Sequence, residues 1–295
     1  MRRIGISCLT SVGRRPTMGG TMSNTTVGIA QWHPACGEPG RNLDAALGNI
    51  ASLAARGCTL VVLPELWASG YDATTLTADA AVAAEPLDGQ RGRRLAAAAA
   101  AHDVWLFAGS VPEIDQDGRL FNTAVVYAPD GSLRARHRKV HLYSPLGEDA
   151  VFTAGSEPTV VDVDGVGTVG LSICFDGDHP EYARALHDLG ARVVISMSAY
   201  EAATESWWDV LYPANALANG QWWLMANQCG GAGPNALLGR SRIIAPDGTV
   251  IAEAPRCDGS EGEDQTHLLV AELDLGAAIA AAEQEAGALW AESGA

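Results

Sequence analysis

Short apolar runs alternate with longer amphipathic segments through most of the chain. Runs rich in Val, Ile and Leu predict buried strands, and longer segments with apolar residues three and four positions apart predict helices. The predicted strands are 26–31, 58–63, 104–109, 168–173, 191–197 and 222–228, and the predicted helices are 42–56, 90–102, 178–189 and 205–219. Strands joined by helices indicate an α/β fold in which helices cover a sheet.

Other segments predict β-hairpins, because two strand-like runs flank a cluster of turn residues. The paired runs are 121–127 with 133–139 around Pro129-Asp130-Gly131, 159–163 with 168–173 around Asp164-Gly165, and the two halves of 237–253 around Pro246-Asp247-Gly248. A last strand is predicted at 267–273. Hairpins pair strands antiparallel, so the sheets are expected to be mixed.

The start of the predicted helix 178–189 has the spacing of a capping box. Asp178 would be the N-cap and Glu181 would stand at the N3 position. In this arrangement the N-cap side chain accepts a hydrogen bond from the first helical turn. The pattern therefore assigns Asp178 to helix capping.

The two ends of the chain differ from the patterned region between them. In residues 1–24 the apolar stretch is short and broken, which excludes a signal peptide of the usual kind and a membrane helix. Met18 and Met22 offer later starts, so this segment is interpreted as a disordered leader or an artefact of start-site choice. Residues 25–275 are interpreted as one domain, and residues 276–295 as a C-terminal helical tail.

Composition narrows the class of protein. The 295 residues are 47% hydrophobic and 18% charged, which is typical of a globular protein, and the formal net charge is −16. A strongly acidic surface repels phosphate backbones and anionic lipids, so no nucleic-acid or membrane partner is expected. The six cysteines are too sparse for a disulfide scaffold and lack the spacing of a zinc site. These features favour a cytoplasmic protein with reduced thiols.

Three reactive side chains follow or end predicted buried strands. They are Glu65, Lys139 and Cys174. Strand ends gather ligands in sheets of this kind, so the three could converge. A cysteine thiolate, a carboxylate base and a cationic oxyanion donor together suffice for acyl transfer. Taken singly, Cys174 also fits a small core residue, Glu65 a solvated loop and Lys139 a solvated basic strand.

The sequence segments around these residues resemble those of the nitrilase superfamily of carbon–nitrogen hydrolases. The resemblance runs from about Val27 to Leu275. The matching segments, in chain order, are 27–31 with Asn42-Leu43, Leu63-Pro64-Glu65 with Gly70-Tyr71, Phe121 to Val126 with Arg138 to Leu142, Gly170 to Asp176 with Pro180-Glu181, and Gly239-Arg240-Ser241 with Pro246-Asp247-Gly248. The resemblance implies a four-layer α-β-β-α sandwich with mixed sheets. It also implies pairing through a helical layer into homodimers or larger homo-oligomers.

Carried over to this sequence, the resemblance assigns a role to each candidate. Glu65 would be the general base, Lys139 the oxyanion stabiliser and Cys174 the nucleophile. The backbone N–H of Phe175 would be the second oxyanion donor. Glu148, between the lysine and the cysteine, would position the substrate or Lys139, although a surface acid beside Asp149 fits it nearly as well. No metal or organic cofactor is implied.

The expected substrate is a small amide. Tyr200 stands where relatives line the pocket, and the neighbouring segment is rich in tryptophan, which favours an apolar or aromatic acyl group. No arginine directly follows Cys174, where members that hydrolyse N-carbamoyl amino acids tend to hold the substrate carboxylate. Phe175-Asp176 follows the cysteine, as in the amide-cleaving branches of the family. Members that act on nitriles have Trp-Glu at these two positions instead. The alternatives are a nitrilase, an N-carbamoyl hydrolase, or an inactive member that serves as a binding module.

Overall fold

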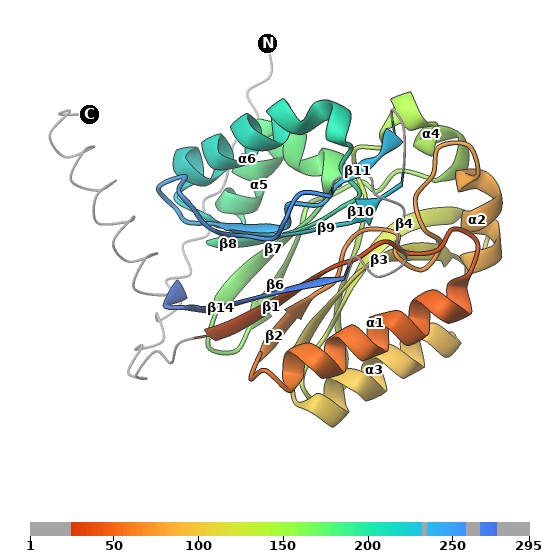
Figure 1. Ribbon diagram of the computed structural model, residues 1–295, viewed down its shortest axis with the longest axis horizontal. Coiled ribbons are helices and arrows are strands. Elements are labelled where there is room, and N and C mark those ends of the chain that lie inside the picture. Colours follow the sequence, from red (N-terminus) through yellow and green to blue (C-terminus); the bar gives the residue numbers. More distant parts are fainter. Residues whose placement is uncertain (1–24, 232–234, 258–265, 276–295) are drawn as a thin grey trace, which may run out of the picture.

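The structure, a computed structural model, describes residues 25–231, 235–257 and 266–275 (Figure 1). The predicted leader and the predicted C-terminal helical tail lie outside these ranges. Among the described residues, no helix has the length and apolar character needed to cross a membrane.

The first of two large sheets is built mainly from the N-terminal half of the described chain. Its strand order is β14-β1-β2-β3-β4-β5. The strands are β1 (Thr25–Gln31), β2 (Leu60–Val62), β3 (Trp105–Ile114), β4 (Leu120–Tyr127), β5 (Leu133–Arg138) and β14 (His267–Leu273). Strands β1, β2 and β3 are parallel, and the other pairs are antiparallel.

The second large sheet repeats this design. Its order is β13-β12-β9-β8-β7-β6, with β7, β8 and β9 parallel. The strands are β6 (Thr159–Val163), β7 (Gly167–Ile173), β8 (Val193–Ser198), β9 (Trp222–Asn227), β12 (Arg242–Ile244) and β13 (Val250–Glu253). A separate short pair joins β10 (Cys229–Gly230) to β11 (Leu237–Leu238).

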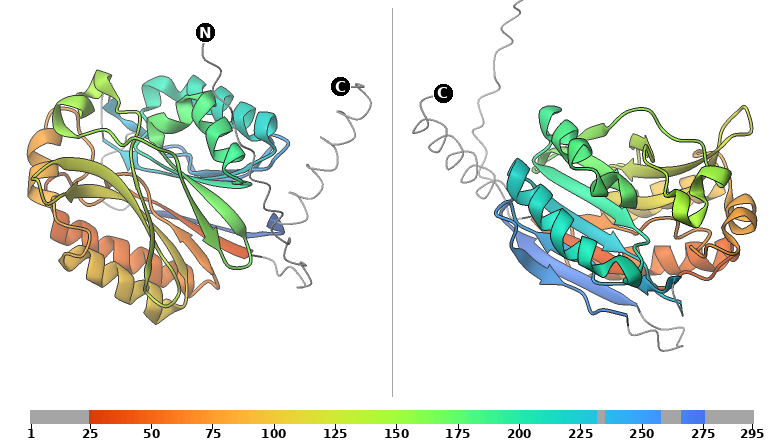
Figure 2. Two further views of the ribbon diagram at one scale, coloured as in Figure 1. Left: turned by 180° about the vertical axis from the view of Figure 1, so that it is seen from behind. Right: turned by 90° about the horizontal axis from the view of Figure 1, so that it is seen from above.

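Helices cover the outer face of each sheet (Figure 1). Helices α1 (Pro39–Ala54) and α3 (Gln90–His102) cover the first sheet, and α5 (Pro180–Asp188) and α6 (Glu205–Asn219) cover the second. Helices α2 (Leu76–Ala83) and α4 (Glu148–Val151) lie together at one end of the sandwich. The views in Figure 2 show the same layers from behind and from above. The predicted four-layer α-β-β-α sandwich with mixed sheets is confirmed.

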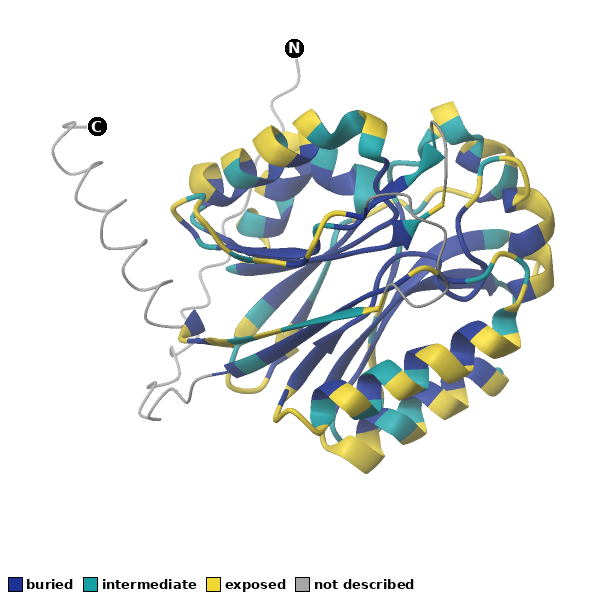
Figure 3. Ribbon diagram, in the orientation of Figure 1, coloured by how far each residue is buried: buried dark blue, intermediate teal, exposed yellow. Residues whose placement is uncertain are grey.

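The largest apolar cluster lies between the two sheets. Val62 and Phe107 from the first sheet pack in one cluster with Val169, Ile195 and Leu224 from the second. Removing such side chains from water stabilises the fold by roughly 1.5–3 kcal/mol each. Exposed residues lie on the outward faces of the helices, as Figure 3 shows. The inner strand faces therefore hold the two sheets in contact, and with them any residues at the strand ends.

Two details of the sequence prediction need correction. Helix α5 begins at Pro180 with His179 as its N-cap, and no side chain caps it. The predicted capping by Asp178 is therefore wrong, because its carboxylate is bound by two tyrosines described below. The predicted hairpin 237–253 is also shorter than expected, since Leu237–Leu238 pairs with β10 in the separate small sheet.

Candidate active site

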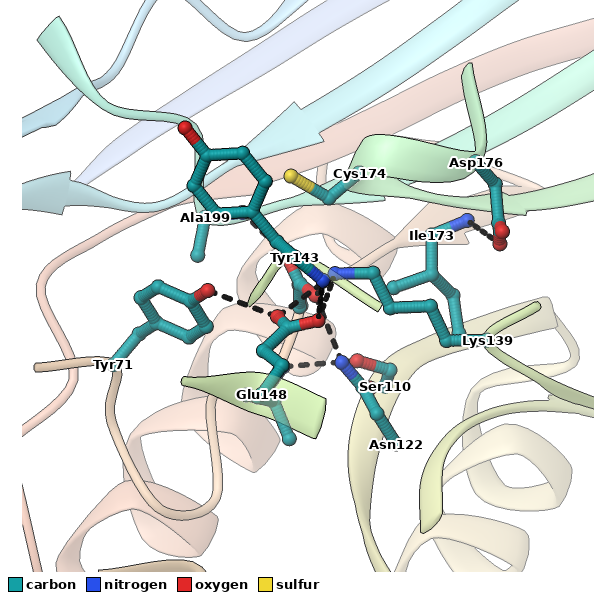
Figure 4. Close-up of polar contacts among 12 residues, drawn as sticks. Tyr71, Ser110, Asn122, Lys139, Tyr143, Glu148, Ile173, Cys174, Asp176 and Ala199 are labelled. Carbon is teal, nitrogen blue, oxygen red and sulfur yellow. Dashed lines mark hydrogen bonds and ion pairs between the residues drawn. The ribbon is translucent and has the colours of Figure 1, made fainter. Parts of the chain in front are cut away.

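The three candidate catalytic residues lie just beyond strands of different sheets. Glu65 follows β2 and Lys139 follows β5 in the first sheet. Cys174 follows β7 in the second sheet. Because the sheets pack face to face, these strand ends meet. In Figure 4, Lys139 and Glu148 point toward one another near the sulfur of Cys174.

The Glu65 carboxylate is fully buried and accepts three hydrogen bonds. Its Oε1 atom accepts one from Lys139 Nζ at 2.9 Å and one from Asn122 Nδ2 at 2.8 Å. Its Oε2 atom accepts the backbone N–H of Ala199, at the end of β8, at 2.8 Å. A carboxylate offers about four acceptor positions. The geometry thus leaves Oε2 a position for one more proton donor.

A second buried carboxylate, Glu148, holds the other side of the lysine. Lys139 Nζ lies 2.8 Å from each Glu148 oxygen. The Tyr71 hydroxyl donates to Oε1 at 2.8 Å, and the Tyr143 backbone N–H donates to Oε2 at 2.9 Å. The Lys139 ammonium is therefore fixed between two carboxylates. Glu148 lies inside the protein, not on the surface as the alternative interpretation had it.

Burial and charge together set the protonation of this cluster. Burial alone would lower the pKa of Lys139, but Glu148 and Glu65 outweigh it and raise that pKa well above its usual range. Burial also raises the pKa of Glu65, against the opposing effect of Lys139. Burial and then Glu65 raise the pKa of the Cys174 thiol. At neutral pH the resting site thus holds a charged lysine and a protonated thiol.

The backbone at Cys174 turns sharply. Cys174 has φ = +46°, in the left-handed region that side chains with a Cβ seldom adopt. The Tyr212 hydroxyl oxygen lies 3.1 Å from the Cys174 carbonyl oxygen. Gly177 allows this approach, because a Cβ there would lie 2.6 Å from the Tyr212 ring. The turn ends β7 at once and directs the sulfur into the cavity described below.

Asp176 ties the lysine segment to the cysteine turn. Its Oδ1 atom accepts the backbone N–H groups of Val140 at 3.1 Å and His141 at 2.8 Å. Its Oδ2 atom accepts the N–H of Ile173 at 3.1 Å and lies 3.0 Å from Nε2 of His137. Although burial opposes ionisation, these hydrogen bonds hold the pKa of Asp176 well below its usual range. One carboxylate therefore sets the spacing between Lys139 and Cys174.

A small cavity that opens to solvent lies beside Cys174. Phe175 and Tyr200 line it, as do the rings of Tyr71, Tyr143 and Trp207. Tyr200 thus lies at the cavity, as the resemblance implied, and its hydroxyl donates to Asp178 Oδ2 at 2.9 Å. Trp208, the next residue of α6, is instead fully buried and does not line the cavity.

Sequence reasoning missed several residues that hold the cluster. Asn122 had a visible signal, since it is a polar residue inside an otherwise apolar strand. Asp176 had another, its place two residues after the nucleophile candidate. The Ala199 backbone N–H gave none, because any residue supplies the same group. Within the described ranges, no group of three or more His, Cys, Asp or Glu side chains could hold a metal ion.

Comparison with known proteins agrees with this arrangement. The chain matches the carbon–nitrogen hydrolase family over residues 26–283. It is 32% identical over 255 residues to 2-oxoglutaramate amidase of Bacillus subtilis (strain 168), covering 85% of this chain and 91% of that protein.

Solved structures show the same relationship. Nit3 of Saccharomyces cerevisiae, a member of branch 10 of the nitrilase superfamily, superposes with a TM-score of 0.77 at 26% identity, covering 89% of this chain and 94% of that one. A mutant amidase from Nesterenkonia sp. AN1, which shows covalent addition of the acetamide moiety of fluoroacetamide at its active-site cysteine, has a TM-score of 0.74 at 26% identity, covering 92% and 98%. The chain belongs to the carbon–nitrogen hydrolases of the nitrilase superfamily, in an amidase-like branch.

Proposed function

We propose that this protein hydrolyses small primary amides, R–CO–NH2 plus water giving a carboxylate and an ammonium ion, with Cys174 as nucleophile. The observation that carries this proposal is the buried cluster of Glu65, Lys139 and Glu148 beside a thiol that lines a cavity. The covalent adduct at the active-site cysteine of the Nesterenkonia amidase supports the same role for Cys174.

Acylation begins when Glu65 takes the thiol proton. Its fourth acceptor position is open, and burial raises its pKa, which makes it a better base. The thiolate attacks the amide carbon, and negative charge develops on the amide oxygen. The Lys139 ammonium and the Phe175 N–H stabilise that oxyanion. Glu65 then gives its proton to the leaving nitrogen, so ammonia departs and a thioester remains.

Deacylation uses the same groups in reverse. Glu65 removes a proton from water, and the resulting hydroxide attacks the thioester carbon. The second oxyanion collapses, the carbon–sulfur bond breaks, and the Cys174 sulfur recovers the proton. Glu148 acts through Lys139 in both steps by fixing its position and charge. No step in this sequence needs a metal or an organic cofactor.

Matched substrates test the choice between amidase and nitrilase. For pairs with the same R group, we expect kcat/KM to be at least about 100-fold higher for the amide than for the nitrile. Attack on an amide places negative charge on oxygen, which the oxyanion donors stabilise, whereas attack on a nitrile places it on the thioimidate nitrogen. Ammonia release measures both reactions. Equal rates for nitriles and amides across several R groups would instead favour a nitrilase. Selective hydrolysis of N-carbamoyl compounds would favour an N-carbamoyl hydrolase.

We also propose that the protein is cytoplasmic and that two copies of the chain form a dimer through α6. The support is a stripe of exposed apolar side chains on one helix face, Trp207, Val210 and Leu217, which are 46%, 64% and 64% exposed. The double change Val210→Glu and Leu217→Glu is expected to shift the sedimentation coefficient toward that of a monomer, since it places charges in the contact. Val82→Glu, at an equally exposed apolar residue of α2, is the control. A monomeric wild type would contradict the pairing.

A further inference from the structure

The wall of the active-site cavity carries two acidic side chains, Asp178 and Glu201. Asp178 comes four residues after Cys174, and Glu201 follows Tyr200 just beyond β8. Neither belongs to the cluster around Lys139 that carries out the proposed reaction. Their presence in the cavity therefore requires another explanation.

The Asp178 carboxylate is held by neutral donors only. Its Oδ1 atom accepts the Tyr212 hydroxyl at 3.0 Å, and its Oδ2 atom accepts the Tyr200 hydroxyl at 2.9 Å. Two phenols orient a carboxylate without neutralising it. Burial raises the pKa of Asp178 to about 6, against the opposing effects of these hydrogen bonds and of Lys139. No lysine or arginine of the described chain forms an ion pair with it.

The Glu201 carboxylate lacks even neutral donors. The residue is only 9% exposed, and in the part of the chain that the structure describes no group donates a hydrogen bond or forms an ion pair to its carboxylate. Burial alone raises its pKa. The Glu201 oxygens are not among the buried polar atoms that lack a partner, so they stay in contact with solvent in the cavity. An acid without a protein partner in the wall of a substrate cavity is a position that a cationic group of the substrate can occupy.

The other residues that line the cavity also favour a cationic group over an anionic one. The described residues that line it include no lysine, arginine or histidine. They do include the rings of Tyr143, Phe175 and Trp207, whose faces attract cations. A substrate carboxylate at this wall would thus meet two acids, while the lysine of the site, Lys139, is already paired with Glu65 and Glu148. A positively charged group would meet two acids and an aromatic surface.

We propose that the natural amide substrate carries a positive charge, an ammonium or a guanidinium, at the end of its acyl group remote from the amide, where Asp178 and Glu201 receive it. This inference rests on the proposed amidase function and adds a charge to the apolar acyl group expected from the sequence. It also distinguishes this chain from its relative named for 2-oxoglutaramate, which is an anionic amide.

Three amides of matched length test the charge preference. They are 5-aminopentanamide, which is cationic, hexanamide, which has a methyl group in place of the ammonium, and glutaramate, which is anionic. Charged hydrogen bonds contribute enough to discriminate about 10- to 100-fold. We expect kcat/KM for 5-aminopentanamide to exceed that for hexanamide at least about tenfold, with glutaramate the poorest, mainly through differences in KM.

Variants of the two acids separate recognition from structural support. Asp178→Asn and Glu201→Gln should each lower kcat/KM for 5-aminopentanamide about tenfold more than for hexanamide. Glu181→Gln, which removes an exposed acid of α5, is the control and should alter no ratio. A purely structural role would lower the rates for all three amides equally and would overturn the inference.

Wild-type substrate preference separates this inference from the proposed function. Hydrolysis of hexanamide or glutaramate as fast as, or faster than, 5-aminopentanamide would overturn the charge preference and leave the amidase intact. Failure to release ammonia from any primary amide would overturn the proposed function and, with it, this inference.

Discussion

Replacing Cys174 with alanine is expected to lower kcat by at least about 10⁴-fold, since loss of the nucleophile in a catalytic unit removes nearly all of its acceleration. The side chain is small and partly buried at the cavity, so the fold should lose no more than about 1 kcal/mol of stability. Ammonia release from a primary amide measures the rate, and the thermal midpoint checks folding. Cys36→Ala, which removes an exposed thiol, is the matched control and should keep full activity.

Covalent labelling adds a second measurement for the same variant. In a Glu65→Leu background, which should not hydrolyse the amide, fluoroacetamide should add one acetamide group to the parent and to its Cys36→Ala variant, and none to its Cys174→Ala variant, when each intact protein is weighed by mass spectrometry. Ammonia release at the wild-type rate by folded Cys174→Ala protein would rule out the proposed nucleophile. So would an adduct on any other residue that correlates with loss of activity.

Changing Glu65 to glutamine is expected to lower kcat by about 10³-fold, because a neutral amide cannot take the thiol proton. The substitution keeps the shape of the side chain. It also points an NH2 group at one of the three groups that donate hydrogen bonds to Glu65, which belong to Lys139, Asn122 and Ala199. A buried donor without an acceptor costs about 1–3 kcal/mol, so the thermal midpoint should fall as well. Loss of stability must therefore be separated from loss of the base.

Glu85→Gln provides that separation. Glu85 also accepts backbone N–H groups, from Gln90 and Arg91, but it lies at the start of α3 and away from the cavity. This control should lower the thermal midpoint and keep kcat. For Glu65→Gln, rapid quenching should show that formation of the acyl-enzyme is slowed, not only its hydrolysis. Accumulation of acyl-enzyme at the wild-type rate would show that another group takes the thiol proton.

Regular elements with a clear period were predictable from the sequence. Helices 90–102 and 205–219 are observed with the predicted bounds, because each has apolar residues spaced along one face. Strand β2 is shorter than predicted, although the backbones of Thr59 and Leu63 still form hydrogen bonds with the neighbouring strands. Helix α2 was missed, because its alanine-rich sequence shows no helical period. Local pattern thus found the layers but not the short elements at their ends.

The candidate site divides along a similar line. Glu65, Lys139, Cys174 and Glu148 could be found from residue type and from segments that resemble a known family. Contacts across the two sheets could not, because they depend on tertiary packing: the Ala199 N–H reaches Glu65 from β8 of the other sheet. The same limit explains the error at Asp178. Its local spacing fits a helix cap, but Tyr200 and Tyr212, which lie far along the chain, bind its carboxylate.

Strand β1 pairs along its whole length with β14. The first strand of the described fold therefore cannot complete its pairing until the last strand has been synthesised. On the ribosome, Thr25–Gln31 emerges long before His267–Leu273. Until then the outer edge of β1 presents unpaired N–H and C=O groups to the cell, and such edges promote association between chains. The N-terminal sheet therefore cannot be completed during early translation, and its open edge favours association between nascent chains until β14 has been made.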